Sequence, residues 1–231
     1  MNSMPFRQLK SLKKILIGVQ YEKAHGFIGS YGVKAPKNKG ETKMEKKQKI
    51  STRKIVFVAL MAALTVVGSA LRIQLPVAIG STTAFHLGNI FCALSGILLG
   101  PWLGGLAAGL GSFLYDIMSN YISECWITFL TKGAYGLVAG LIAWGSTKDW
   151  NYVKALIATV AGALTYAVLY LAKSYFYNGL LVHGYTSSAS LADVVAKLPA
   201  TTFNAVVAIV FAPVLAVSIR KALEHNHLTL E

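Results

Sequence analysis

Residues 86–119 read HLGNIFCALSGILLGPWLGGLAAGLGSFLYDIMS, an apolar stretch that is interrupted by a turn signal at Gly100-Pro101. A Gly-Pro pair allows the chain to reverse its direction immediately. The stretch therefore predicts two neighbouring helices, one over about 86–100 and the next over about 102–119. Two apolar helices joined by so short a turn are typical of a membrane protein.

The composition of the whole chain agrees with a membrane location. Of its 231 residues, 55% are hydrophobic and 13% are charged, whereas soluble domains carry about 25% charged residues. The first 50 residues lack the continuous apolar core of a signal peptide. Cys92 and Cys125 lack the spacing of metal ligands, so neither a metal site nor a disulfide framework is expected.

Further apolar segments of spanning length lie on both sides of the opening pair. Together the expected helices cover about 53–71, 86–100, 102–119, 124–144, 153–177 and 192–219. The sequence therefore predicts an all-α, polytopic membrane protein with a bundle of six transmembrane helices over residues 51–222. A basic, partly disordered N-terminal extension over 1–50 and a short C-terminal tail over 223–231 complete the expected organisation.

The basic residues are concentrated at the N-terminal end. Residues 1–54 contain 14 basic and three acidic residues, a net charge of +11, and the remaining 177 residues carry +2. A uniformly basic chain would indicate a nucleic-acid partner, whereas a basic end before an apolar body predicts a cytoplasmic N-terminus in the cell membrane. An even number of crossings places the C-terminus in the cytoplasm as well, and no nucleic acid is expected to bind. Met44 could serve as an alternative start residue of a shorter chain. The segment before it is therefore expected to be a dispensable extension or an upstream start.

The ionisable residues within or at the edge of the apolar segments all fall in the predicted outer halves. A charge inside the bilayer costs about 2.5–3.5 kcal/mol on the insertion scale, so these side chains should face a cavity or one another. Helical spacing groups them into stripes, for example Glu124, Thr128 and Lys132. Snorkelling or buried ion pairs, such as Asp116 with Lys132 or Lys197, are the alternative for any single residue. The convergence of five stripes predicts an outward-facing pocket, for which the candidate substrate-binding residues are Arg72, His86, Asn89, Asp116, Lys132, Tyr170, Lys173, Lys197 and Asn204.

Small residues recur at four-residue spacing, which allows helix backbones to approach closely. Most of the glycines in this pattern are expected to serve internal packing. Ala59 and Ala63 lie on the first helix, in the half without charges and next to the basic end. They are candidates for a surface that meets another membrane protein.

Several classes of function lack their motifs. No phosphate-binding loop of the type Gly-x-x-x-x-Gly-Lys-Ser/Thr occurs, so the chain is not expected to bind ATP itself. An intramembrane serine protease would need a Gly-x-Ser-Gly turn, but the sequence has Ala93-Leu94-Ser95-Gly96. A stand-alone channel, transporter or intramembrane enzyme stays open as the alternative class.

The residues resemble the S component of energy-coupling factor (ECF) vitamin transporters. The likeness covers about residues 50–222 and is strongest at ALMAA (59–63), RIQLP (72–76), GILLGPWLGG (96–105) and Tyr115-Asp116. It implies a non-enzymatic, substrate-binding membrane subunit with a loop between its first two helices covering the outer pocket. Ala59 and Ala63 would dock on a membrane-embedded T subunit, and two cytoplasmic ATPases would use the ATP, so no cofactor is expected in this chain.

The implied mechanism is capture of a vitamin outside the cell and its release inside when the subunit topples in the membrane. The likeness places cobalamin or a related corrinoid first among the substrates, followed by folate, pantothenate and riboflavin. From the residues alone, the basic and acidic groups of the outer rim nearly balance, which suits a zwitterionic or amide-rich ligand as well as an anion.

Overall fold

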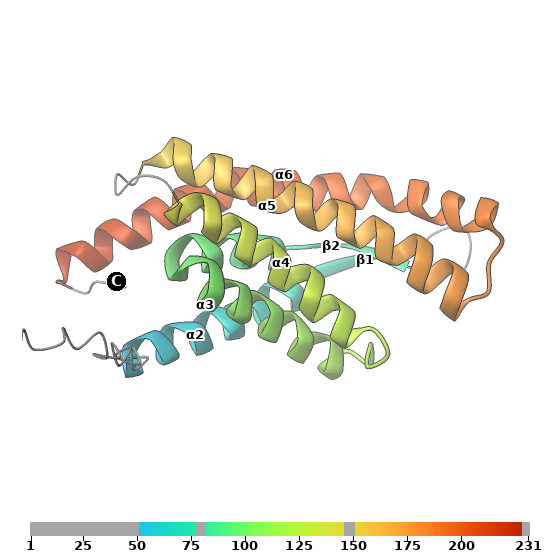
Figure 1. Ribbon diagram of the computed structural model, residues 1–231, viewed down its shortest axis with the longest axis horizontal. Helices are drawn as coiled ribbons and strands as arrows, with labels where there is room; N and C mark the ends of the chain where they lie inside the picture. The colour runs from blue at the N-terminus through green and yellow to red at the C-terminus, as the bar shows by residue number, and fades with distance from the viewer. Residues whose placement is uncertain (1–50, 77–81, 146–150, 228–231) are drawn as a thin grey trace, which may run out of the picture. The chain divides into compact units, whose positions relative to one another are not determined.

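A computed structural model describes residues 51–76, 82–145 and 151–227. Its helices form a bundle, shown in Figure 1. They are α2 (Thr52–Ala70), α3 (Gly88–Met118), α4 (Cys125–Trp144), α5 (Tyr152–Ala172) and α6 (Ser187–His225). Strands β1 (Arg72–Pro76) and β2 (Thr82–His86) lie between α2 and α3, and α5 continues directly into a π-helix, η1 (Lys173–Val182). The expected extension over 1–50 lies outside the described residues.

Five helical segments of the described chain are long and apolar enough to cross a membrane. The expected count of six separate helices is therefore not confirmed, because the two expected over 86–100 and 102–119 form the single element α3. This element is not straight, since Gly100 has a φ of 80° inside it. The hydroxyl of Ser95 donates to the carbonyl oxygen of Gly104 at 2.9 Å, although nine residues of continuous helix span about 13 Å. The two halves of α3 thus fold back on each other at Gly100-Pro101.

Glycines and a tryptophan hold this bend against α4. A Cβ atom on Gly96 would collide with the backbone of Gly136, and one on Gly140 would meet Pro101. The Trp144 ring lies on Gly100, and its indole N–H donates to the carbonyl oxygen of Ile97 at 2.9 Å. Because side chains are absent at these contacts, the backbones of α3 and α4 touch directly.

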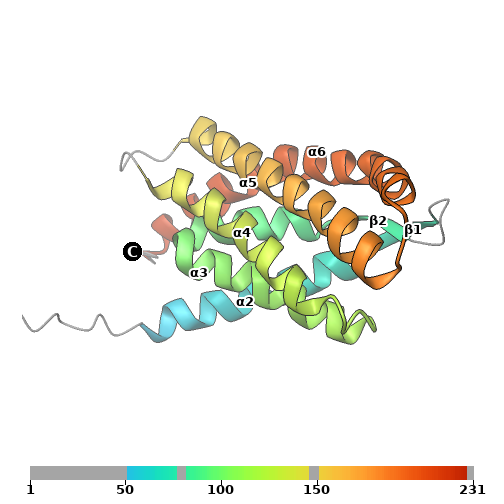
Figure 2. The same cartoon turned by 45° about the vertical axis from the view of Figure 1, so that its right-hand side comes forward.

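The segment between α2 and α3 was expected to be a loop but forms an antiparallel hairpin. Arg72 pairs with His86 and Pro76 with Thr82 in its register. The fold is thus not purely α-helical, and His86 ends a strand instead of beginning a helix. Figures 1 and 2 show the hairpin at the end of the bundle where α3 connects to α4 and where α6 begins.

Two further boundaries differ from expectation. The loop expected from residue 178 starts later, because η1 extends the fifth helix to Val182. The last helix begins at Ser187, before the expected residue 192, and its N-cap Thr186 accepts from the backbone N–H of Ala189 at 3.3 Å. A cluster of buried apolar residues fills the part of the bundle around the Gly100 bend, including Leu94, Ile97 and Ala139.

Candidate functional site

A cavity of about 350 Å³ opens at the hairpin end of the bundle. Side chains from the hairpin and from α3, α4, α5, η1 and α6 line it. Eight of the nine candidate residues contribute to this lining, namely Arg72, His86, Asp116, Lys132, Tyr170, Lys173, Lys197 and Asn204. The ninth, Asn89, is buried with 1% of its surface exposed and contacts the cavity residue Lys132.

Lys132 is a buried cation on the α4 side of the cavity, with 4% of its surface exposed. Its Nζ donates a hydrogen bond to Oδ1 of Asn89. The same Nζ lies 3.9 Å from the centre of the Tyr166 ring, whose π face attracts a cation. The lysine is therefore held by an amide and an aromatic face, both of which are neutral.

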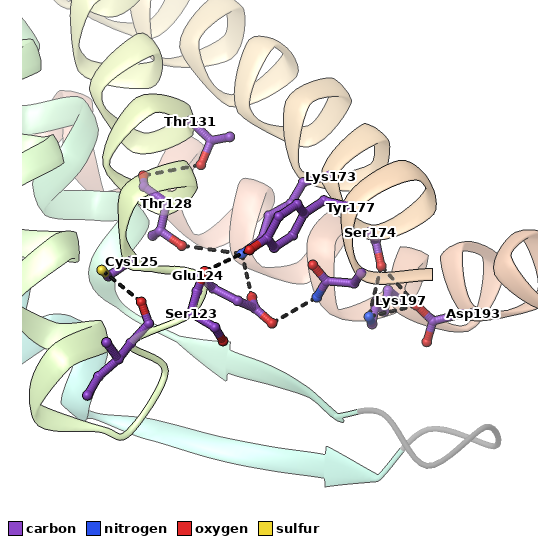
Figure 3. A network of polar contacts seen from close by, with 12 residues as sticks. Ser123, Glu124, Cys125, Thr128, Thr131, Lys173, Ser174, Tyr177, Asp193 and Lys197 are labelled. Atoms are coloured by element: carbon purple, nitrogen blue, oxygen red, sulfur yellow. Dashed lines mark hydrogen bonds and ion pairs between the residues drawn. The ribbon is translucent and has the colours of Figure 1, made fainter. Parts of the chain in front are cut away.

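Lys173 begins η1 and is paired with the first residues of α4, as Figure 3 shows. Its Nζ lies 2.5 Å from a carboxylate oxygen of Glu124 and 3.3 Å from the hydroxyl oxygen of Thr128. The other carboxylate oxygen of Glu124 accepts from the side-chain amide of Asn178 at 3.0 Å. Tyr177 adds a hydrogen bond to the carbonyl oxygen of Ser123 at 2.8 Å. One face of η1 is thus bound to the start of α4.

Lys197 on α6 is also paired within the protein. Its Nζ lies 2.7 Å from Oδ2 of Asp193, and the two side chains are 4% and 2% exposed. Ser174 of η1 joins them, because its hydroxyl accepts from Lys197 at 2.8 Å and donates to Asp193 at 2.9 Å. Figure 3 shows this trio linking η1 to α6.

Asp116 takes neither of the partners considered from the sequence. Among the described residues, Lys173 pairs with Glu124 and Lys197 pairs with Asp193 instead. Asp116 is buried with 8% of its surface exposed. Its carboxyl group interacts electrostatically with Lys173, Glu124 and Lys132. Its carboxylate is a hydrogen-bond acceptor on the α3 wall.

Asn204 uses its amide to hold the hairpin. Its Oδ1 accepts from the backbone N–H of His86 at 2.9 Å, and its Nδ2 donates to the carbonyl oxygen of Ala84 at 2.8 Å. Its neighbour Phe203 packs on Phe85, with ring centroids 4.5 Å apart. The amide of Asn204 therefore completes the backbone hydrogen bonding of β2 and fixes this strand to α6.

The other strand is held through Tyr121, in the connection between α3 and α4. Arg72 and Gln74 both donate to the Tyr121 hydroxyl at 3.2 Å. The Arg72 guanidinium also lies about 5 Å from the centres of the Tyr115 and Tyr121 rings. Burial, and after it the charges of Lys132 and Arg72, lower the pKa of His86 well below its ordinary value. His86 is accordingly neutral, and its Nδ1 accepts from the backbone N–H of Gly88 at 3.2 Å.

Stacked tyrosines form one wall of the cavity. Tyr135, Tyr166 and Tyr170 follow one another with ring centroids 5.8 and 5.7 Å apart, and the last two line the cavity. Such a wall suits a flat aromatic ring. No group of three or more His, Cys, Asp or Glu side chains in the described chain could hold a metal ion.

Glu124, Ser174 and Asn178 are among the lining residues that the sequence analysis does not include in its candidates. The spacing of Glu124 with Thr128 and Lys132 was the available signal for the first of them. Ser174 and Asn178 lie where an ordinary helix was expected to end, so no spacing pointed to them. Ala59 and Ala63 are exposed on α2, on a face that the described bundle does not cover.

Comparison with known proteins identifies similarity to a family and to a curated protein. A family model described as "ECF-type riboflavin transporter, S component" matches residues 49–221. A protein of Pyrococcus woesei, described as "Uncharacterized protein in gap 3'region", is 33% identical over 117 residues, which are 51% of this chain and 74% of that protein.

Proposed function

This chain belongs to the S components of ECF-type riboflavin transporters, and on that premise we propose that the cavity at the hairpin end binds riboflavin. The family is one of transporters and not of enzymes, and its S components work with a T subunit and ATPases. The order of substrates expected from the resemblance is not confirmed, since it placed cobalamin first and riboflavin last. Riboflavin replaces cobalamin as the proposed substrate.

The observation that carries this proposal is the pairing of the cavity lysines. Lys173 and Lys197 each have a carboxylate within 2.7 Å, and Lys132 is engaged by Asn89 and Tyr166. An anionic vitamin would have to compete with these internal partners, which is costly in a buried site. Riboflavin is uncharged at neutral pH, so it can bind without separating the pairs. Folate and pantothenate carry carboxylates and fit this arrangement less well.

Size and shape support the same substrate. Cavities for drug-sized ligands measure about 300–1,000 Å³, and the cavity of about 350 Å³ lies at the lower end of this range. A corrinoid is several times larger than a flavin and exceeds this space. The flat isoalloxazine ring matches the wall of Tyr166 and Tyr170, and the ribityl hydroxyls match side chains such as Asp116 and Thr131.

The direction of transport requires the cavity to face outward. If each half of α3 crosses the membrane, the described chain crosses six times and both its ends lie on the side of the basic N-terminal segment, the cytoplasm. The hairpin end then faces outside, where it captures the vitamin. We assign docking on the T subunit to the exposed residues Ala59 and Ala63, whose small side chains allow close helix contact.

Binding of flavins to the purified full chain tests the substrate. Titration should show quenching of riboflavin fluorescence with a stoichiometry of one, and cobalamin, folate and pantothenate should not displace the flavin. Displacement by cobalamin at equal concentration would contradict the proposal.

Assembly is tested separately, because a stand-alone channel or enzyme would need no partner. The chain should co-purify with a T subunit and two ATPases. The A59W/A63W variant should retain riboflavin binding but lose this association and the uptake of riboflavin into cells. Normal uptake by that variant would refute the docking assignment.

A further inference from the structure

η1 is an unusual element in a binding-site wall. It runs for ten residues, whereas π-helices are rare and mostly single turns that mark functional sites. The backbone N–H of His183 donates to the carbonyl oxygen of Asn178 at 2.9 Å, which is the i→i+5 bond of this helix type. Three residues of η1, Lys173, Ser174 and Asn178, line the cavity.

The π geometry decides which side chains share a face. At about 4.4 residues per turn, as its i→i+5 bonds imply, Lys173, Tyr177 and Asn178 fall within an arc of about 80°. In an α-helix of 3.6 residues per turn, Asn178 would point about 140° away from Lys173. Only the wider helix therefore lets Lys173 and Asn178 reach the same partner on α4.

That common partner is Glu124. One of its carboxylate oxygens pairs with Lys173 at 2.5 Å, and the other accepts from Asn178 at 3.0 Å. Because a carboxylate only accepts, the bond also fixes the direction of the Asn178 amide, with its Nδ2 toward Glu124. Ser174, on a different side of η1, is held by Asp193 and Lys197.

Two buried polar atoms at η1 oppose the wide form of the helix. Oδ1 of Asn178 is buried without a hydrogen-bond partner in the described chain, and so is the hydroxyl of Ser190, which lies against Gly179. Buried polar atoms without partners each cost about 1–3 kcal/mol. The ion pair of Glu124 with Lys173 and its hydrogen bond from Asn178 are together strong enough to offset such a cost. Charge-assisted hydrogen bonds are about twice as strong as neutral ones.

We propose that Glu124 is a positioning residue of the binding site, which holds η1 in its π form by pairing with Lys173 and Asn178 and so places the η1 side chains on the cavity wall. Glu124 acts through these two residues, and riboflavin does not need to touch it. The part of this inference that concerns ligand affinity rests on the proposed function, whereas the part that concerns η1 does not.

The experiment compares single variants with a charge swap in the purified full chain. E124Q and K173M should each weaken riboflavin binding about tenfold or more, as expected for one lost charge-assisted hydrogen bond. The E124K/K173E swap restores the ion pair, and the Asn178 amide can turn to accept from the new lysine. Because residues in contact are energetically coupled, the swap should recover the wild-type Kd to within about twofold.

Hydrogen exchange of residues 173–182 gives a readout that needs no ligand. Exchange should be faster in E124Q and K173M and should return to the wild-type rate in the swap. The matched control is E224Q, which breaks the more exposed pair between Arg220 and Glu224 on α6 and should change neither readout. Should a single variant fail to fold, E124L/K173M, which removes both charges, should fold but show faster exchange in η1 and weaker riboflavin binding.

The possible results separate the two proposals. Wild-type protein that does not bind riboflavin refutes the proposed substrate, while the exchange data still test the role of Glu124. Unchanged exchange in E124Q or in E124L/K173M overturns that role. A swap that restores exchange but not binding also overturns it, because Glu124 or Lys173 would then contact the ligand directly.

Discussion

Replacing Lys197 by methionine should strongly destabilise the protein, because it leaves the buried Asp193 carboxylate without its cation. At the observed 2.7 Å, two unit charges attract each other by about 6 kcal/mol at an effective dielectric constant of about 20. Much of this attraction only offsets the desolvation of the two groups. Removing one partner of such a buried pair costs about 3–5 kcal/mol, which corresponds to a fall of roughly 6–20 °C in the melting temperature of a domain of this size.

The double variant D193L/K197M should recover most of this loss. It removes both charges, and replacing a buried pair by apolar residues of similar volume is often neutral or stabilising. Ser174 loses both of its partners in this variant, but its hydroxyl can donate to a backbone carbonyl of the preceding turn. Thermal unfolding of the full chain in detergent, followed by tryptophan fluorescence, measures all three proteins.

The same pair of variants tests whether Lys197 contacts the substrate. With the charge of Lys197 satisfied by Asp193 and Ser174, the folded double variant should bind riboflavin with a Kd close to that of the wild type. A double variant that is as stable as the wild type but does not bind riboflavin would refute the reasoning. Lys197 would then be a substrate ligand, as the sequence alone suggested.

Three further predictions concern other parts of the molecule. K132M removes the donor to Asn89 and the cation on Tyr166, so calorimetry should show riboflavin affinity reduced about tenfold or more; unchanged affinity would mean that Lys132 does not shape the site. G96V places a side chain against the Gly136 backbone, so size-exclusion chromatography should recover no folded protein. The control G133A should be tolerated, because a Cβ atom at Gly133 would lie 3.4 Å from its nearest neighbour. His86 has a lowered pKa, so the folded state resists its protonation. Its contribution to stability is complete above the unfolded value of about 6.5 and declines as the pH falls below it. The melting temperature should therefore fall more steeply with acidification in the wild type than in H86Q, and equal slopes would contradict this.

Helical spacing predicted which faces of the helices are polar, but not what those faces contact. Asp116, Lys132 and Tyr170 were expected at a pocket and do line the cavity. Lys197 and Asn204 line it too, yet their polar atoms are engaged by Asp193 and by the backbone of β2. A period of 3.6 residues specifies the direction of a side chain, whereas its partner depends on which other helix lies opposite.

The elements that were missed depart from this period. Residues 72–76 and 82–86 form strands, for which alternation over five residues is a weak signal beside long apolar helices. In η1, Lys173 and Asn178 share a face although they are five residues apart, a spacing that no α-helical pattern contains. The outer loop is therefore shorter than the 178–190 expected from the sequence, because η1 extends to Val182 and α6 begins at Ser187.

Close packing at the glycines of α3 and α4 limits the depth of the cavity. Ser112 and Thr131 line the cavity, but about one turn farther along both helices a Cβ on Gly136 would lie only 3.1 Å from that of Ala108. From there to the Gly100 bend, backbone meets backbone and no space for a ligand is left. Toward the hairpin, larger polar side chains such as those of Tyr170, Lys132 and Asp116 line the space that remains between the helices. The paired lysines are thus satisfied within the protein, so the many ionisable groups of this wall are compatible with the uncharged ligand that we propose.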